Sequence, residues 1–368
     1  MVFVLIISYI YSIYLSSIVL DVVFIFILLF CVIVFSSNNL FILYLSYESS
    51  LLPILFIIVK WGSYPERSLR AIMLLVYTAL FTFPFIYIIF YLLRHFGTFQ
   101  FPLFSSLPSF LFSLIIFLTF AVKLPIYGLH FWLPIAHVEA PTFGSIILAG
   151  ILLKLGGVGL LRLSRVFDFV LLSEALLGYA FIFLVYSTVV CMFQSDFKRL
   201  VAYSSVSHIM AIPILVLSNN YFSFKVIVML ILFHGLSSPI LFMLVGVLYS
   251  IFSTRQLVAI RGLLIMNPLI SFMLMIAFFF TISAPPFPSF VSEVFFIIGG
   301  LQLSWFIVPF LLLFTFFSIV YNLNWLSSIV FGSSVDVVKT MNFTYLSFSP
   351  LILRFVYAFV LVGIFTLL

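Results

Sequence analysis

The sequence predicts an all-α, polytopic membrane protein of about twelve transmembrane helices. Hydrophobic residues make up 66% of the 368-residue chain and charged residues only 7%, whereas about a quarter of the residues in a soluble domain are charged. Apolar runs of roughly 20 residues, the length that crosses a bilayer, follow one another along the chain. Short polar or proline-containing stretches separate these runs. No room remains for a sizeable soluble domain, so we expect residues 1–368 to form one membrane domain.

Hydropathy places the expected spans in order along the chain. They cover residues 2–18, 20–36, 39–60, 69–93, 109–131, 141–163, 171–193, 197–218, 222–249, 267–300, 303–325 and 350–367. The residues between these spans are of types that commonly end or begin helices. Residues 36–39 are Ser-Ser-Asn-Asn, residues 62–67 contain Gly and Pro, and Pro141 suits the first turn of the sixth helix.

The loop charges predict an orientation. If the helices alternate in direction, one side of the membrane carries nine basic residues and the other carries four. The first set is Lys60, Arg67, Arg70, Lys198, Arg199, Arg255, Arg261, Lys339 and Arg354; the second is Arg94, Arg162, Arg165 and Lys225. The richer side is expected to face the matrix or cytoplasm. A formal net charge of +6 suits such loops better than a nucleic-acid-binding surface.

Cysteine usage and the N-terminus exclude other classes. Cys31 and Cys191 are isolated in apolar runs, and two such thiols do not suffice for an iron–sulfur cluster or a zinc site. We expect them to be packing residues. Residues 1–20 contain neither a basic n-region nor an Arg-rich presequence. We therefore expect no cleavage or import signal. In a eukaryote, that expectation fits a membrane protein synthesised inside the organelle in which it works.

Two of the expected spans are interrupted by proline. One break follows Lys123 at Pro125, and the other contains Pro285, Pro286 and Pro288. Proline inside a helix removes a backbone hydrogen bond, and freed backbone groups at membrane depth need protein or water around them. A broken helix in each half is typical of transporters built from inverted repeats. We expect the fourth to sixth and the eighth to tenth spans to belong to such repeats.

Several titratable residues fall near mid-depth in these spans. At 1.5 Å per residue, Glu48 lies roughly 14 Å into its helix, Lys154 about 20 Å, His208 about 17 Å and His234 about 18 Å. A charge at this depth costs on the order of 2.5–3.5 kcal/mol, so each one needs a reason. The predicted buried layer consists of Glu48, Lys123, Lys154, His208, His234 and Glu293.

Such a layer is suited to moving protons. Glu48 and Lys123 can pair, whereas Lys154 has no opposite charge close in sequence and is free to exchange its proton. The two histidines titrate near neutrality and relay protons through water, and Glu293 ends the row. Structural alternatives remain open: an ion pair at Glu48, snorkelling lysines, core histidines, and a helix-terminus partner at Glu293.

Other polar residues have structural interpretations. We expect Glu139 to favour the N-terminus of the following helix, and His130 and His137 to lie at the membrane interface. Asp196 and Lys198 fit a loop and a helix start. Three glycines in the sixth span predict close helix packing, and Lys225 an interfacial anchor. These glycines are Gly156, Gly157 and Gly159. No phosphate-binding Gly-rich string and no Ser/His/Asp constellation is present.

Several motifs resemble one known family. Residues 123–134 read KLPIYGLHFWLP, residues 136–142 AHVEAPT and residues 153–159 LKLGGVG. Further matches are Tyr47-Glu48, residues 194–198 (QSDFK), residues 202–208 (AYSSVSH) and His234-Gly235. The chain is similar over about residues 44–300 to the antiporter-like membrane subunits of respiratory complex I, mitochondrial NADH–ubiquinone oxidoreductase. Glu293 and the run 136–141 resemble its chain 4 group more than the sister chain 5 group.

The resemblance implies a function and an organisation. It implies a proton-translocating subunit of the membrane arm, in the mitochondrial inner membrane, with other membrane-arm subunits as partners. It places Glu48, Lys123, Lys154, His234 and Glu293 in the proton path. NAD, flavin, iron–sulfur clusters and ubiquinone would belong to other subunits, with no cofactor in this chain. Residues 39–300 would form the core, flanked by N-terminal helices in 1–38 and C-terminal helices in 301–368.

The sequence departs from the family in two places and leaves two rival functions open. Family members usually have about fourteen helices, so the first two or so are expected to be absent here. They commonly carry lysine at the position of Ile135, which receives no role. The rivals are a subunit of a multisubunit sodium/proton antiporter and a structural spacer, and a spacer would not need the buried charges.

Overall fold

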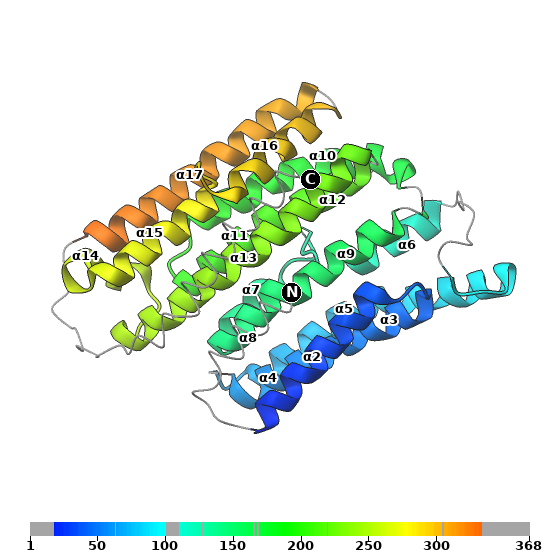
Figure 1. The fold of residues 1–368 in the computed structure, drawn as a ribbon, viewed down its shortest axis with the longest axis horizontal. Helices are drawn as coiled ribbons and strands as arrows, with labels where there is room; N and C mark the ends of the chain where they lie inside the picture. The colour runs from blue at the N-terminus through cyan, green and yellow to red at the C-terminus, as the bar shows by residue number, and fades with distance from the viewer. Residues whose placement is uncertain are drawn as a thin grey trace.

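The computed structural model describes residues 18–332, apart from 63, 101–109, 127, 165, 168, 219 and 304. Its helices lie side by side and run roughly along one direction (Figure 1). The chain crosses the molecule from α2–α5 at one edge, through α6–α9 and α10–α13, to α14–α17 at the opposite edge. The first and last expected spans, 2–18 and 350–367, lie outside the described residues, apart from Ile18. Residues 333–349 lie outside them as well.

The first half of the described chain contains eight α-helices and one π-helical segment, which ends two residues before Lys154. In order these are α2 (Ile18–Ser36), α3 (Leu40–Ser49), α4 (Leu51–Trp61), α5 (Arg67–Phe96), α6 (Phe110–Ala121), α7 (Trp132–Glu139), α8 (Thr142–Ile147), η3 (Leu148–Leu152) and α9 (Leu153–Leu163). Asn39 caps α3 by accepting hydrogen bonds from the backbone N–H groups of Phe41 and Ile42.

The second half contains eight further α-helices and two short 3₁₀ turns. These are α10 (Val170–Met192), α11 (Phe197–Ile209), α12 (Ala211–Ser218), α13 (Tyr221–Phe252), η4 (Leu257–Ala259), α14 (Leu263–Met266), α15 (Pro268–Ile282), α16 (Pro288–Leu301), η5 (Trp305–Ile307) and α17 (Val308–Phe331). A proline in the first turn of α15, α16 and α17 suits those helix starts.

Seven helical segments of the described chain are long and apolar enough to cross a membrane. They are α2, α3 with α4, α5, α8 with α9, α11 with α12, α13, and α17 with the preceding η5. Two further expected spans, 171–193 and 267–300, correspond to α10 and to α15 with α16. The span expected at 109–131 contains α6, but the structure continues it beyond the break as α7, which ends at Glu139. Both proline-containing segments interrupt helices as predicted, but the first break begins after Ala121, so Lys123 lies inside it rather than before it. The span expected at 303–325 instead ends at Phe331, because its helix begins at Val308.

Contacts join the loops at each end of the molecule. At one end, Asp196 pairs as an isolated β-bridge with Gln256. At the other, Asn39 pairs with Gln100. The first end carries seven of the nine basic residues predicted for one side, and we call it the basic end: Lys60, Arg67, Arg70, Lys198, Arg199, Arg255 and Arg261. Lys339, Arg354 and Arg165 lie outside the described residues.

Basic side chains bind the C-terminal carbonyl groups of helices. Lys198 donates from Nζ to the carbonyls of Val138 and Ala140 at the end of α7, and Arg255 donates to Val138 over 3.2 Å. Arg162 donates to Val34 at the end of α2 over 2.6 Å. These carbonyls have no partner within their own helix, and the cations also oppose the negative end of the helix dipole. Lys198 lies in the first turn of α11, as expected for a helix start, and its side chain is buried.

Glycines allow α9 to pack closely, as predicted. A Cβ on Gly159 would lie 2.2 Å from a ring carbon of Phe120 in α6. A Cβ on Gly157 would lie 3.0 Å from Ile231 in α13. The absence of these side chains brings α6 and α13 against the helix that carries Lys154.

Candidate functional site

The first helix break places Lys123 inside the protein. Helix α6 ends at Ala121, and the chain resumes as α7 only at Trp132. The break leaves the carbonyl of Val122 without a helical partner, and it accepts a 2.9 Å hydrogen bond from the indole Nε1 of Trp132. Lys123 is fully buried. Its Nζ donates to the carbonyl of Tyr47 over 2.8 Å and lies 3.2 Å from the centre of that ring.

Glu48 follows Tyr47 on α3, so it lies beside the Lys123 site. It is half-buried, and its Oε1 has no hydrogen-bond partner among the described residues. The expected direct pair with Lys123 is absent, because the lysine is turned to the carbonyl and ring of Tyr47 instead. The two residues thus share a site without forming an ion pair in this structure.

A local change of helix type precedes Lys154. Residues Leu148–Leu152 are π-helical, a rare form that often marks functional sites. Lys154 is buried, and its Nζ donates to the carbonyl of Ala149 within this segment. The same Nζ lies 2.8 Å from Nδ1 of His234 on α13. Next to His234, a Cβ on Gly235 would lie 3.4 Å from the Lys154 side chain, so glycine leaves room for it.

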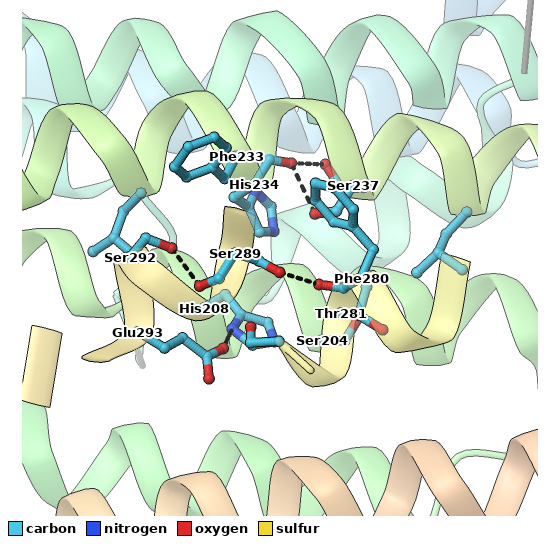
Figure 2. A pocket seen from close by; sticks show the side chains of 14 residues that line it. Ser204, His208, Phe233, His234, Ser237, Phe280, Thr281, Ser289, Ser292 and Glu293 are labelled. Atoms are coloured by element: carbon cyan, nitrogen blue, oxygen red, sulfur yellow. Dashed lines mark hydrogen bonds and ion pairs between the residues drawn. The ribbon is translucent and has the colours of Figure 1, made fainter. Parts of the chain in front are cut away.

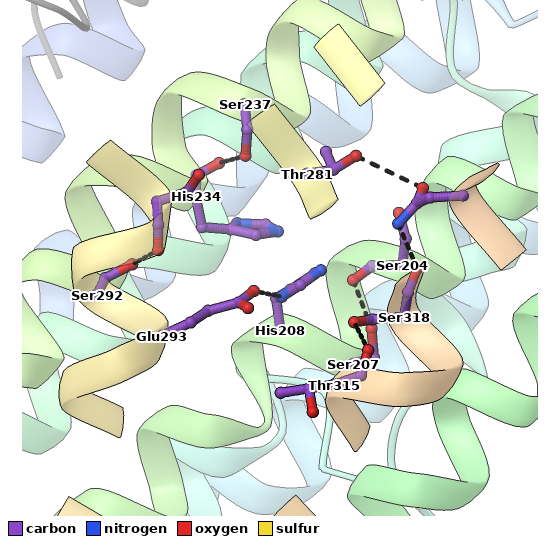
Figure 3. A network of polar contacts seen from close by, with 12 residues as sticks. Ser204, Ser207, His208, His234, Ser237, Thr281, Ser292, Glu293, Thr315 and Ser318 are labelled. Carbon is purple, nitrogen blue, oxygen red and sulfur yellow. Dashed lines mark hydrogen bonds and ion pairs between the residues drawn. The ribbon is translucent and has the colours of Figure 1, made fainter. Parts of the chain in front are cut away.

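The second half of the row lies on α11, α13 and α16. The ring centroids of His208 and His234 are 6.1 Å apart. His208 Nδ1 lies 3.4 Å from Oε1 of Glu293, as Figure 3 shows. The Nε2 atom of His208 is buried without a hydrogen-bond partner in the described part of the chain.

A small cavity with polar and apolar walls occupies the space between these groups. It offers about 30 Å³ to the centres of water molecules, and one water needs roughly 10–15 Å³ of such space. His208, His234 and Glu293 line it together with hydroxyl side chains (Figure 2). These hydroxyl residues are Ser204, Ser237, Ser238, Thr281, Ser283, Ser289 and Ser292. The cavity therefore has both the room and the partners to hold water between His234 and Glu293.

The second break shapes this cavity. Helix α15 ends at Ile282 and α16 begins at Pro288. Ser289 donates across the break to the carbonyl of Phe280 over 2.7 Å, as Figure 2 shows. At both breaks, a side chain beyond the gap satisfies a carbonyl before it, as membrane depth requires.

The six predicted residues thus fall into two groups. Lys154, His234, His208 and Glu293 form a continuous series with the cavity. Lys123 and Glu48 meet at Tyr47, and a Cβ on Gly156, two residues after Lys154, would lie 3.3 Å from the Cβ of Lys123. Packing of α6 on α9 therefore brings the first group against the second.

Comparison with known proteins gives the family. A family model described as the NADH:quinone oxidoreductase/Mrp antiporter transmembrane region matches residues 37–320. The chain belongs to this family. It is 36% identical over 327 residues to NADH-ubiquinone oxidoreductase chain 4 of Locusta migratoria, covering 86% of this chain and 72% of the relative. It is 38% identical over 305 residues to the chain 4 of Ceratitis capitata, covering 80% and 67%.

A chain of known structure has the same fold. A chain of respiratory complex I from Thermus thermophilus with bound NADH superimposes with a TM-score of 0.77. The match covers 92% of this chain and 79% of that chain, at 21% identity. The overall arrangement of helices described above is therefore shared with that chain.

Sequence reasoning missed the groups that hold the row. Tyr47, Trp132 and the cavity hydroxyls received no role, although serines clustered in apolar spans were a usable signal. Three other polar residues are buried in the protein. His130 and His137 are 3% and 0% exposed, and their depth relative to the membrane stays a prediction. Glu139 lies just before α8 as expected, and it pairs with Arg70 of α5 over 2.6 Å.

Proposed function

We propose that this chain is a proton-translocating subunit of the membrane arm of an NADH:ubiquinone oxidoreductase, in the mitochondrial inner membrane. Family membership and the names of its relatives support the assignment. We assign NAD, flavin, iron–sulfur clusters and ubiquinone to other subunits of that assembly. The observation that carries the role of this chain is the series Lys154, His234, water-sized cavity, His208 and Glu293.

Proton transfer along this series needs only short steps. The Lys154 ammonium donates toward Nδ1 of His234, which accepts as a neutral ring, over 2.8 Å. His234 then passes a proton through water in the cavity to His208, whose Nδ1 is 3.4 Å from the Glu293 carboxylate. An imidazole ring has two nitrogens, so it can accept a proton on one and release a proton from the other, which suits both intermediate positions. A charged side chain at this depth has lost its hydration. Main-chain and hydroxyl groups around the series can form hydrogen bonds to the charge in place of the lost water.

Lys123 and Glu48 form the switch in this proposal. The Lys123 ammonium rests on the carbonyl and ring of Tyr47, and Glu48 retains a buried oxygen without a partner. Rotation of the lysine toward that carboxylate closes an ion pair and removes a positive charge from the neighbourhood of Lys154. Charges interact strongly in an environment of low dielectric constant. A change in the quinone-reducing subunits of the assembly can therefore alter the proton affinity of the titratable residues in this row.

The two rival functions are less well supported. The relatives are named as NADH-ubiquinone oxidoreductase subunits, which favours the respiratory assembly over a stand-alone sodium/proton antiporter. A structural spacer gives no reason to keep Lys154 buried without a carboxylate partner, because leucine fills such a position at lower cost.

The test replaces Lys154 by methionine in the assembled complex. We expect Lys154→Met to lower the number of protons pumped per electron, because methionine keeps the volume but cannot carry a proton. The measurement is proton translocation against NADH oxidation in sealed vesicles. Lys225→Met is the matched control, since Lys225 lies near the start of α13, away from the row, with its Nζ 5.5 Å from the ring of Tyr221.

Normal stoichiometry in a fully assembled Lys154→Met complex would refute the proposed path. Equal losses in Lys154→Met and Lys225→Met would also count against it, because the effect would then not depend on the row. Lys123→Ala and Glu48→Ala should lose pumping while the complex still assembles.

A further inference from the structure

Helix α7 is the second half of the first broken helix, and it is short and enclosed. It has eight residues, and all of them except Ile135 are buried. At 1.5 Å per residue it is about 12 Å long, so it reaches only from the break to the basic end. A helix this short is not stable by itself, because tertiary contacts supply most of the stability of a helix. Its position therefore depends on the groups that hold it.

Cations on separate elements hold the end of α7 that lies at the basic end. Arg70 of α5 forms an ion pair through its Nε with Oε1 of Glu139 over 2.6 Å. Lys198 of α11 and Arg255, which follows α13, donate to main-chain carbonyls at the end of α7. These positive charges also face the negative end of the helix dipole. The end of α7 is thus tied to several parts of the chain that are distant in sequence.

The carboxylate of Glu139 depends on Arg70. The Glu139 side chain is 1% exposed, and its Oε2 has no hydrogen-bond partner among the described residues. Arg70 also contacts Glu66 over 2.7 Å, but that side chain is 65% exposed, and exposed ion pairs contribute little to stability. A shielded charge that loses its partner is strongly destabilising. Motion of α7 away from Arg70 would therefore leave an uncompensated carboxylate inside the protein.

The other end of α7 is held at the break. Trp132 donates from Nε1 to the carbonyl of Val122 over 2.9 Å, and Val122 directly precedes Lys123. Along the helix, His137 stacks on Phe242 of α13, with ring centroids 4.6 Å apart and ring planes 12° apart. Contacts at both ends and along its length thus fix α7, and the residue before Lys123 is fixed with it.

We propose that α7 is the stationary half of the first broken helix, and that Arg70 and Glu139 are positioning residues that keep it so. The switch at Lys123 is then a rotation of the lysine side chain within a rigid break, rather than a displacement of the half-helix. This inference rests on the proposed function, because it specifies which part of the proposed switch moves. Arg70 and Glu139 act through α7 and carry no proton in this scheme.

Amide hydrogen exchange in the assembled complex tests the rigidity of α7, read from peptides that cover residues 132–140. We expect equally slow exchange in the resting complex and during NADH oxidation. Arg70→Met should raise the exchange rate of α7 at least roughly tenfold, because Glu139 is left without its partner. Glu66→Gln is the matched control, since it removes the exposed partner of Arg70 and should leave the exchange of α7 unchanged.

The number of protons pumped per electron gives the functional half of the test. Arg70→Met should lower this ratio, and Arg70→Lys, which keeps the positive charge, should restore most of it. Glu139→Gln serves if the methionine variant fails to assemble. The amide keeps the shape of the carboxylate but removes its charge, so α7 should again exchange faster than in the wild-type complex.

Faster exchange of α7 during NADH oxidation in the wild-type complex would overturn the proposal, because α7 would then move with the switch. Unchanged exchange in both Arg70→Met and Glu139→Gln would overturn it as well. So would a loosened α7 with normal pumping, because the position of α7 would then not matter to the switch. The exchange results are read from one helix, so they do not depend on whether Lys154 carries protons.

Discussion

Buried lysines in this chain are held by main-chain carbonyl groups rather than by carboxylates. Lys123 donates to Tyr47, Lys154 to Ala149 and Lys198 to Val138. A carbonyl dipole solvates the ammonium without adding a full negative charge. The proton on such a lysine is therefore less firmly fixed than in a buried ion pair. Glu139 shows the opposite arrangement, with its Arg70 partner at 2.6 Å, as suits a structural contact.

At the residue scale, Gly159 gives a test of packing around Lys154. Gly159→Ala should destabilise the chain by ~1–3 kcal/mol, the usual effect of overpacking, because its Cβ would fall 2.2 Å from the Phe120 ring. The measurement is the thermal stability and yield of the assembled complex. Gly178→Ala is the control, since a Cβ there meets nothing within 4 Å. If both alanine variants were as stable as wild type, close packing of α6 on α9 would not require glycine.

At the scale of elements, the two broken helices solve the same problem with different side chains. An indole satisfies the freed carbonyl of Val122, and a serine hydroxyl satisfies that of Phe280. Each break lies beside charged or titratable groups: Lys123 in the first, Glu293 shortly after the second. A break at membrane depth is stable only with such partners, so these donors position the row without taking part in transfer.

Trp132→Phe tests this positioning role. The change keeps an aromatic ring but removes the donor to Val122, and an unsatisfied buried carbonyl costs ~1–3 kcal/mol. We expect lower thermal stability together with a reduced pumping rate, measured on the assembled complex. Trp305→Phe is the control, because Trp305 is 82% exposed. Similar behaviour of the two variants would show that the indole hydrogen bond does not hold the break.

At the scale of the whole molecule, the uneven charge of the two ends defines an orientation. Contacts between loops bring five basic side chains together at the basic end: Lys60, Arg67, Arg70, Lys198 and Arg255. Basic loops tend to remain on the side of the membrane from which a chain is inserted. We therefore expect the basic end to face that side, and the opposite end, with Asn39 and Gln100, to face the other compartment.

Site-specific labelling tests this orientation. The chain has only two native cysteines, and both are buried, so an introduced thiol is readily distinguished. Thr254→Cys lies at the basic end and Asn220→Cys at the opposite end, both exposed. A membrane-impermeant maleimide should label Thr254→Cys only from the matrix side and Asn220→Cys only from the other. The reverse pattern would invert the topology, and labelling from one side at both positions would contradict the helix order.

The sequence predicted the spans and both breaks well, and the contacts of single residues less well. Long apolar runs and prolines act locally, so the break at Lys123 was readable from Pro125 alone. The missing Glu48–Lys123 pair was not, because the carbonyl and ring of Tyr47 compete for the ammonium only once α3 packs against α6. The stacking of His137 on Phe242 of α13 at 4.6 Å was not predicted either, because that partner lies more than one hundred residues away in the chain.

The sequence by itself determined a membrane protein of many helices, two interrupted spans and a set of charges too costly to leave in lipid. These features follow from local composition, because each polar group placed in the bilayer carries its own free-energy cost. Only the tertiary structure decided that Lys154 reaches His234, that His208 reaches Glu293, and that hydroxyl groups enclose a cavity between them. Those contacts join α9, α11, α13 and α16, and distances of a few ångströms between separate helices depend on packing that no local pattern encodes.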